Sequence, residues 1–189
     1  MAIDVKPERV IEVLHSVGIN CVLMGTHALN TYRDEARATQ DVDVLVRKKD
    51  VAKAVKALAE AFPALTINDT PVVTRFVDPA TAKVVLDVMK PTQGVLQVIF
   101  RHTLPVGQTH RIPDLEMALA SKFAAMVSAN RRPDKKMIDA GDFMNVVMNN
   151  RQDIDLKKLQ RLAEKVYAGG SKEILAMIAD IDAGRTLEF

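Results

Sequence analysis

Two aspartates, Asp41 and Asp43, stand two residues apart in a run of valines. Alternate residues of a β-strand point to one face and rise about 3.3 Å each, so these carboxylates are expected about 6 to 7 Å apart. Val42, Val44 and Val46 take the opposite face. At an effective dielectric constant of about 20 the two charges repel by roughly 2.5 kcal/mol. A divalent metal ion or an arginine would offset this repulsion, and Mg²⁺ is commonly held by one or two carboxylates together with substrate phosphates.

A third acid, Asp87, interrupts the apolar run of residues 84–89. Charged residues seldom interrupt buried strands unless they are paired. If this strand lies beside the first, the three carboxylates converge and could hold one or two metal ions across a transferring phosphoryl group. The spacing alone leaves another interpretation open, in which Asp41 and Asp43 are solvated or capping residues at a strand end and Asp87 pairs with a lysine.

Gly25 and Thr26 follow the expected strand of residues 21–24 and precede a helix. A glycine lets the backbone turn sharply, and the threonine hydroxyl can cap the helix. The amide groups at a helix N-terminus attract anions, so phosphates fit there. Arg37 stands four residues before Asp41 and could bind phosphate oxygens in a bidentate fork, or it could be an ordinary surface arginine.

These residues together resemble the signature of the DNA polymerase β-type nucleotidyltransferase superfamily. The resemblance is carried by Gly25-Thr26, by the loop Arg37-Ala38-Thr39-Gln40-Asp41-Val42-Asp43 and by Asp87. The loop is especially similar to a minimal bacterial branch that includes the abortive-infection toxins of type IV toxin–antitoxin systems. Thr26 stands where the superfamily usually has Gly or Ser, so it keeps a hydroxyl and adds a methyl group.

The resemblance implies a two-metal site and a nucleotide site. Its metal and catalytic residues would be Asp41, Asp43 and Asp87, with Mg²⁺ or Mn²⁺ as the ion. Its nucleoside triphosphate would be bound by the following residues: Gly25, Thr26, Arg37, Thr39 and Lys122. It further implies an acceptor such as tRNA, a protein side chain or a small antibiotic, and it raises an antitoxin as a possible partner.

Lys122 and two later acids have simpler interpretations as well. Lys122 lies within an apolar helix, where its ammonium group could reach solvent at the edge of the buried stripe. The segment 131–136 carries four cations and reads equally as a phosphate-binding or a solvated loop. Asp139 and Asp142 are three residues apart on one helical face, so they could position this loop or contact a base or an acceptor.

Composition argues for a compact intracellular protein. The 189 residues can form one domain with an adequate core, or a small domain with a helical appendage. The 26 basic and 24 acidic side chains give a net charge of +2, too near neutral to indicate a polyanion partner by bulk charge. The single cysteine excludes an intrachain disulfide and suits a reducing cytosol. No signal-peptide pattern or membrane-spanning run is seen, so a cytoplasmic protein without a membrane partner is expected.

Hydrophobic periodicity predicts an α/β (α+β) fold, and the resemblance implies that its strands form a small mixed sheet flanked by helices. Strands are expected at 21–24, 41–46, 65–68, 72–77 and 83–89, with helices at 7–17 and 51–62, the second capped by Asp50, and a further helix favoured at 92–101. A hairpin is expected around Gly107. Four helices follow, at 114–130, 134–149, 155–167 and 171–182. The pattern therefore divides the sequence into residues 1–112, which the resemblance implies are a nucleotidyltransferase catalytic domain, and a helical subdomain, residues 113–189.

The expected reaction moves a nucleoside monophosphate from a triphosphate to an acceptor hydroxyl, and pyrophosphate leaves. Asp41 and Asp43 would hold both metal ions, and Asp87 would hold the catalytic ion and help to deprotonate the acceptor. Two other classes remain open. One is a catalytically degenerate binding or regulatory protein of the same fold, which would bind nucleotide without releasing pyrophosphate. The other is a metal-dependent phosphoesterase, which would release phosphate or nucleoside without an acceptor.

Overall fold

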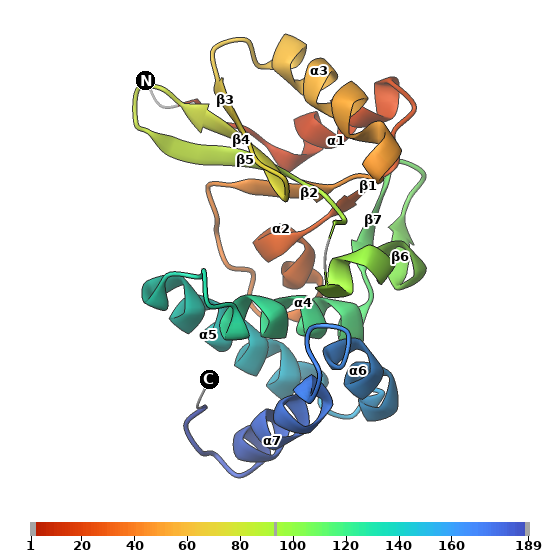
Figure 1. Cartoon of the computed structure of the whole chain (residues 1–189), viewed down its shortest axis with the longest axis vertical. Coiled ribbons are helices and arrows are strands. Elements are labelled where there is room, and N and C mark those ends of the chain that lie inside the picture. The colour runs from red at the N-terminus through yellow and green to blue at the C-terminus, as the bar shows by residue number, and fades with distance from the viewer. Residues whose placement is uncertain (1–2, 93, 188–189) are drawn as a thin grey trace. The chain divides into compact units, whose positions relative to one another are not determined.

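The computed structural model describes residues 3–92 and 94–187, which fall into two compact units (Figure 1). The first unit consists of the residues up to Ala28 together with Arg37–Pro113. The second consists of Leu29–Ala36 and the residues from Asp114 onward. A short N-proximal segment thus belongs with the C-terminal helices, because the chain leaves the first unit after Ala28 and returns at Arg37.

The first unit is built on a seven-stranded mixed sheet. Its strands lie in the order β3 (Thr66–Asp69), β4 (Val73–Asp78), β5 (Lys83–Met89), β2 (Val42–Leu45), β1 (Cys21–Leu23), β7 (His110–Pro113) and β6 (Thr103–Val106). The pairs β2–β5 and β1–β7 are parallel, and the other neighbours are antiparallel. Because apolar residues alternate along the strands, one face of this sheet is apolar and must be covered by other elements.

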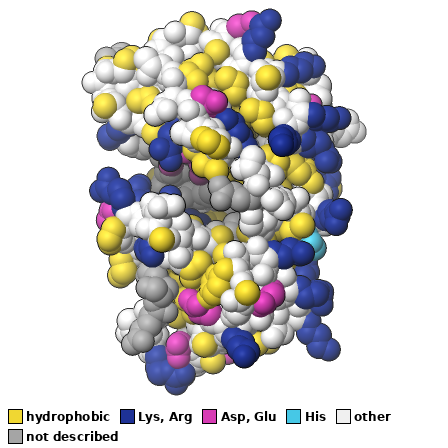
Figure 2. All heavy atoms as spheres, in the orientation of Figure 1, with side chains coloured by type: hydrophobic (Ala, Val, Ile, Leu, Met, Phe, Trp, Pro, Cys, Tyr) yellow, Lys and Arg dark blue, Asp and Glu magenta, His cyan; other side chains and the backbone are white. Residues whose placement is uncertain are grey.

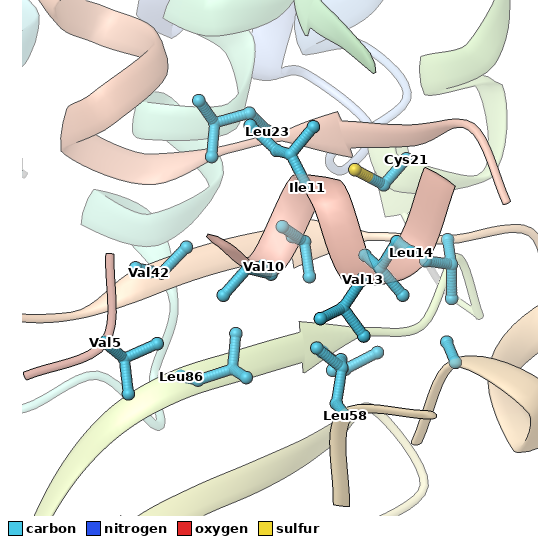
Figure 3. Close-up of a cluster of buried hydrophobic side chains, with 14 of the residues drawn as sticks. Val5, Val10, Ile11, Val13, Leu14, Cys21, Leu23, Val42, Leu58 and Leu86 are labelled. Atoms are coloured by element: carbon cyan, nitrogen blue, oxygen red, sulfur yellow. The ribbon is translucent and has the colours of Figure 1, made fainter. Parts of the chain in front are cut away.

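Helices α1 (Pro7–Ser16) and α3 (Val51–Ala61) provide this cover. Figure 3 shows Val10 and Leu14 of α1 and Leu58 of α3 among side chains from the strands, such as Val42 and Leu86. All five of these side chains are buried. Val44 and Val46 are buried as well, as the two-residue alternation predicts. Asp43, which stands between Val42 and Val44, consequently lies on the other face of the sheet.

Most predicted elements of this unit are confirmed, with three differences. Strand β2 begins at Val42, so Asp41 immediately precedes the strand. Asp50 occupies the cap position of α3, but its side chain makes no capping hydrogen bond, because a 3₁₀ turn, η2 (Lys48–Asp50), leads into the helix. The helix favoured for 92–101 is a 3₁₀ helix, η3 (Gly94–Arg101). The predicted hairpin around Gly107 is confirmed as β6–β7.

The second unit contains the four predicted helices and a 3₁₀ turn, η1 (Asn30–Tyr32), that follows the short helix α2 (Gly25–Leu29). The helices are α4 (Leu115–Val127), α5 (Pro133–Asn150), α6 (Leu156–Ala163) and α7 (Gly170–Asp182). Asp114 and Asp155 cap α4 and α6 by accepting backbone N–H bonds from Met117 and Lys158. The fold class predicted from the sequence, a mixed sheet with flanking helices and a helical C-terminal half, is confirmed. Within the described part of the chain, no helix is long and apolar enough to cross a membrane.

Candidate active site

The centre of the candidate site is a pair of aspartates on neighbouring parallel strands. Asp43 of β2 and Asp87 of β5 are direct partners in the register of the two strands. Register partners in a parallel pair project from the same face, about 4.8 Å apart across the strands. From the sequence, Asp43 and Asp87 were expected to be neighbours only if two strands some forty residues apart lie side by side. The structure shows that these strands do pair.

Gly25 lies directly against the Asp43 carboxylate. A Cβ atom at Gly25 would stand 2.0 Å from Asp43 Oδ2, far inside van der Waals contact. The residue also has a φ of +60°, in the left-handed region that favours glycine. Two independent constraints therefore require glycine here, and the first residue of α2 lies against the Asp43 carboxylate.

Asp41 lies beside this pair in sequence but has a local partner. The Thr39 hydroxyl donates a hydrogen bond to Asp41 Oδ1. Such a bond two residues back along the loop orients the carboxylate from outside the strand. Thr39, which was expected to contact nucleotide, thus also acts on one of the three expected metal ligands.

Thr26 and Arg37, the other expected nucleotide contacts of this unit, meet each other. Arg37 Nη2 donates to Thr26 Oγ1 at 2.5 Å, and Thr26 is buried. The hydrogen bond joins the glycine turn to the loop that leads into the acidic strand. The expected residues of this unit thus meet in three contacts, Gly25 with Asp43, Thr26 with Arg37 and Thr39 with Asp41, and strand pairing places Asp87 beside Asp43.

Arg75 is a neighbour of Asp87 that the sequence gave no reason to single out. It is the register partner of Asp87 on β4, and its Nε lies 3.8 Å from Asp87 Oδ1. Asp43, Asp87 and Arg75 thus form one row across β2, β5 and β4. Asp87 does meet a cation, as one sequence interpretation expected, but the cation is an arginine rather than a lysine.

The donor set suits a hard divalent cation, with one qualification in its geometry. Two carboxylates in register, one of which packs against Gly25, supply the oxygen ligands that Mg²⁺ and Mn²⁺ prefer. Among residues 3–92 and 94–187, however, no three His, Cys, Asp or Glu side chains are gathered closely enough to hold a metal ion. Asp41 is bonded to Thr39 and Asp87 lies beside Arg75, so neither carboxylate is turned solely toward Asp43.

Lys122, expected at the nucleotide, lies in the helical unit within a network of ion pairs. Its Nζ bonds Asp139 Oδ1 at 2.8 Å and Asp142 Oδ2 at 2.7 Å. The two acids are only 2% and 3% exposed. Arg131 donates to Asp139 at 2.9 Å from Nε, so Asp139 positions the start of the basic loop, one of the two roles expected for it.

Arg33 completes this network and was missed at the sequence level. Its Nη2 bonds Asp142 Oδ1, and both side chains are buried. Asn150 Nδ2 also donates to the Tyr32 carbonyl at 2.7 Å. These contacts attach the segment 29–36 to α5. No local pattern signals them, since the partners are more than one hundred residues apart in the chain.

Comparisons by sequence find nothing: no protein-family model and no curated protein matches this chain. Solved structures match its fold. The Megavirus polyadenylate synthase matches with a TM-score of 0.56 at 12% identity. The aligned region covers 100% of this chain and 46% of the synthase chain. The antibiotic-resistance factor ANT(2″)-Ia has a TM-score of 0.55 at 11% identity, with 94% of this chain and 95% of its own covered. An H. pylori structure described as a nucleotidyltransferase has a TM-score of 0.50 at 18% identity, covering 96% and 80%.

The chain has a nucleotidyltransferase-like fold. At these identities the likeness concerns the fold alone, and the residues of the site stand on the contacts described above. Within the nucleotidyltransferase-like fold, two of the acids that resembled the superfamily signature, Asp43 and Asp87, lie on adjacent strands, and Gly25 lies against Asp43.

Proposed function

We propose that this chain is a metal-dependent nucleotidyltransferase that moves a nucleoside monophosphate from a triphosphate to an acceptor hydroxyl. The observation that carries the proposal is the Asp43–Asp87 register pair beneath the Gly25 turn. Two carboxylates lie side by side on neighbouring strands and Gly25 makes room for one of them, an arrangement for which a purely structural role gives no reason. The fold shared with nucleotidyltransferases supports the same conclusion.

The proposal assigns catalysis to residues 1–112. Asp41, Asp43 and Asp87 would hold Mg²⁺ or Mn²⁺, which when bound supplies charge neutralisation at the transferring phosphoryl group. Asp87 would also take the proton of the acceptor hydroxyl. Arg75 lies next to it, with Nε 3.8 Å from Asp87 Oδ1. Most of the rate enhancement would come from holding the reactants in line in a site arranged in advance.

The nucleotide would bind at the turn and loop that the Arg37–Thr26 hydrogen bond joins. Arg37 could bind phosphate oxygens bidentately, while Gly25 lets the backbone approach closely. Thr39 orients Asp41. Lys122 is assigned to phosphate through the resemblance, and within the helical unit its ammonium group bonds Asp139 and Asp142.

The acceptor is proposed to be an RNA such as tRNA, a protein side chain or a small molecule. ANT(2″)-Ia, which shares the fold, has been solved in complex with adenylyl-2″-tobramycin, at a TM-score of 0.51 and 10% identity. The resemblance to toxin-type transferases favours a cellular macromolecule, together with an antitoxin partner and a cytoplasmic location. Figure 2 shows Lys and Arg side chains mainly around the margin of one face, with a few Asp and Glu side chains among them.

A nucleotide-binding protein without transferase activity is the second candidate. One observation favours it, namely that Asp41 is bonded to Thr39 and the three acids are not gathered as a metal site within the described chain. The two candidates differ in a measurable way, because only the transferase releases pyrophosphate.

The test is to incubate the protein with Mg²⁺ or Mn²⁺ and each nucleoside triphosphate labelled at the α-phosphate, together with total RNA and protein as acceptors. Transfer of label with release of pyrophosphate is expected. Asp43→Asn should abolish both, and Asp153→Asn, an exposed acid outside the site, should leave both unchanged.

Titration calorimetry on the same proteins separates the alternatives. Metal-dependent binding of a triphosphate, with no pyrophosphate released, would establish the binding protein instead. Release of phosphate or nucleoside without any acceptor would establish a phosphoesterase. Full transferase activity in Asp43→Asn would overturn the assignment of the site.

A further inference from the structure

Arg75 stands in a polar row that crosses the face of the sheet on which Asp43 lies (Figure 1). The row consists of register partners on four neighbouring strands: Asp43 on β2, Asp87 on β5, Arg75 on β4 and Asn68 on β3. Neighbouring members stand about 4.8 Å apart across the strands. Asn68 is exposed on the edge strand of the sheet. Arg75 is therefore the cation of this row, and the row stays polar up to the open edge.

The guanidinium group of Arg75 is only loosely held by Asp87. Its Nε lies 3.8 Å from Asp87 Oδ1, whereas a charge-assisted hydrogen bond between such groups is about 2.7 to 2.9 Å long. The side chain is 47% exposed, and among residues 3–92 and 94–187 it pairs with no second acid. An arginine carries five N–H donors and can bind a phosphate with two of them at once. Arg75 consequently has donors left for an anion from outside the chain.

Arg75 and the proposed triphosphate site lie on opposite sides of the acidic pair. The Gly25 turn follows β1 and packs against Asp43, so the triphosphate would lie on the β1 side. Arg75 lies beyond Asp87 in the strand order β1, β2, β5, β4. In phosphoryl transfer the attacking and leaving oxygens are roughly in line, with the phosphorus between them. Because pyrophosphate would leave on the β1 side, the acceptor would approach from the side of Asp87 and Arg75.

The charge of Arg75 favours one kind of acceptor. A cationic small molecule would be repelled by the guanidinium group, and a serine or threonine side chain carries no fixed anion beside its hydroxyl. A nucleic-acid strand has a phosphodiester one sugar away from its terminal hydroxyl. The two acids of the row would repel this phosphodiester, and Arg75 would attract it. Contacts to phosphate position a strand without reading its sequence, which is the task that a lone arginine beside the reacting hydroxyl can perform.

We propose that Arg75 binds the phosphodiester next to the 3′-terminal hydroxyl of a polynucleotide acceptor, and so selects nucleic acid over protein and small-molecule acceptors. The inference rests on the proposed transferase function. In that reaction the hydroxyl oxygen bonds the α-phosphorus, its proton passes to Asp87 and the bond to pyrophosphate breaks. Arg75 determines specificity by placing the hydroxyl, and it takes no part in these bond changes. The residues that carry the inference all lie in the first unit.

The test measures binding of a pentanucleotide of mixed sequence, labelled at its 5′ end, by fluorescence anisotropy without metal ion or triphosphate. RNA and DNA strands are compared, each also in a version whose last phosphodiester is replaced by a neutral methylphosphonate. The natural protein should bind at least one of the two strands, and its neutral version at least about tenfold more weakly. Arg75→Gln should bind both versions with the same, lower affinity. Arg75→Lys keeps the charge and should restore part of the difference.

Arg9→Gln is the matched control. Arg9 is likewise an exposed arginine paired with an acid, Glu12, but it lies on α1, which covers the opposite face of the sheet. This variant should behave like the natural protein. Salt dependence gives a second readout, because each phosphate contact on a single strand adds about 0.7 to the slope of log K against log salt concentration. Arg75→Gln should lower this slope by about 0.7 and leave the Kd of a triphosphate with Mg²⁺ unchanged.

Three results would overturn the proposal. Failure of the natural protein to bind either strand would show that the acceptor is not a polynucleotide. Equal binding of the charged and neutral versions would show that Arg75 does not contact this phosphate. A triphosphate that binds Arg75→Gln as weakly as the strand does would place Arg75 on the nucleotide side. Failure of the transferase function is distinguishable, because the natural protein would then release no pyrophosphate although it still binds the strand through Arg75.

Discussion

Asp43 and Asp87 are direct register partners on the parallel strands β2 and β5. At about 5 Å and an effective dielectric constant of about 20, two such charges repel by of order 3 kcal/mol. A cation that binds between them removes this cost in the folded state only. Saturating Mg²⁺ should therefore raise the thermal midpoint by several degrees, which corresponds to about 2 to 3 kcal/mol at a hundred times the Kd. Calorimetric scans of the natural protein and of Asp43→Asn check this, and an equal rise in both would place the ion elsewhere.

Gly25→Ala should abolish nucleotide transfer. The new Cβ would stand 2.0 Å from Asp43 Oδ2, so the carboxylate or the turn must move. Gly107→Ala is the matched control, because Gly107 also has a positive φ, +56°, but a Cβ there meets nothing within 4 Å. Both variants should lose about 1 to 2 kcal/mol from backbone strain, but only Gly25→Ala should lose activity. Urea unfolding and pyrophosphate release measure the two effects, and an active Gly25→Ala enzyme would contradict the site.

Thr26→Val should weaken triphosphate binding by about tenfold, or about 1.4 kcal/mol, because it removes the hydroxyl that accepts the hydrogen bond of Arg37. Valine keeps the shape of the side chain, so the fold should persist. Thr26→Ser keeps the hydroxyl and should bind like the natural protein. Titration calorimetry gives the Kd of the triphosphate for each variant. Equal affinities for Thr26→Val and Thr26→Ser would mean that the hydrogen bond does not shape the nucleotide site.

Lys122→Met should destabilise the protein by about 3 to 5 kcal/mol, since it leaves the buried Asp139 and Asp142 with one cation fewer. The Asp139→Asn change should be less harmful in the Lys122→Met background than alone, because both remove members of one pair. A double-mutant cycle in urea gives this coupling energy. Additive losses would show that Lys122 is not held by the acids and would favour a role at the nucleotide alone.

Alkaline pH should destabilise the fold through Cys21. Burial raises the pKa of this thiol from 9.0 to about 11. The folded state keeps the proton where the unfolded state loses it, so the contribution is fully present below pH 9 and is lost as the pH rises through 11. The loss amounts to about 2 to 3 kcal/mol for a shift of this size. Cys21→Ala should show a shallower fall in unfolding free energy over this range, and an identical fall would assign the effect to other groups.

The local chemistry of the site could be read from the sequence. Alternation predicted that Asp43 takes the face opposite Val42 and Val44, because alternation is a property of the strand itself, whereas Asp41 precedes strand β2. Helical periodicity located α4 to α7 for the same reason. The sequence also indicated that the sharp backbone turn at Gly25 needs a glycine. It gave no sign that the Asp43 carboxylate lies against this residue.

Tertiary structure decided which of these residues meet. Strand pairing brought Asp87 to Asp43 and set Arg75 beside it, and no local pattern specifies the neighbour of a strand. Lys122 was readable only as a lysine in an apolar helix, and folding gave it two buried acids as partners. The attachment of Arg33 to Asp142 spans more than one hundred residues. Periodicity is fixed by the geometry of one element, whereas ion pairs and strand order depend on how several elements pack, so only the folded chain reveals them.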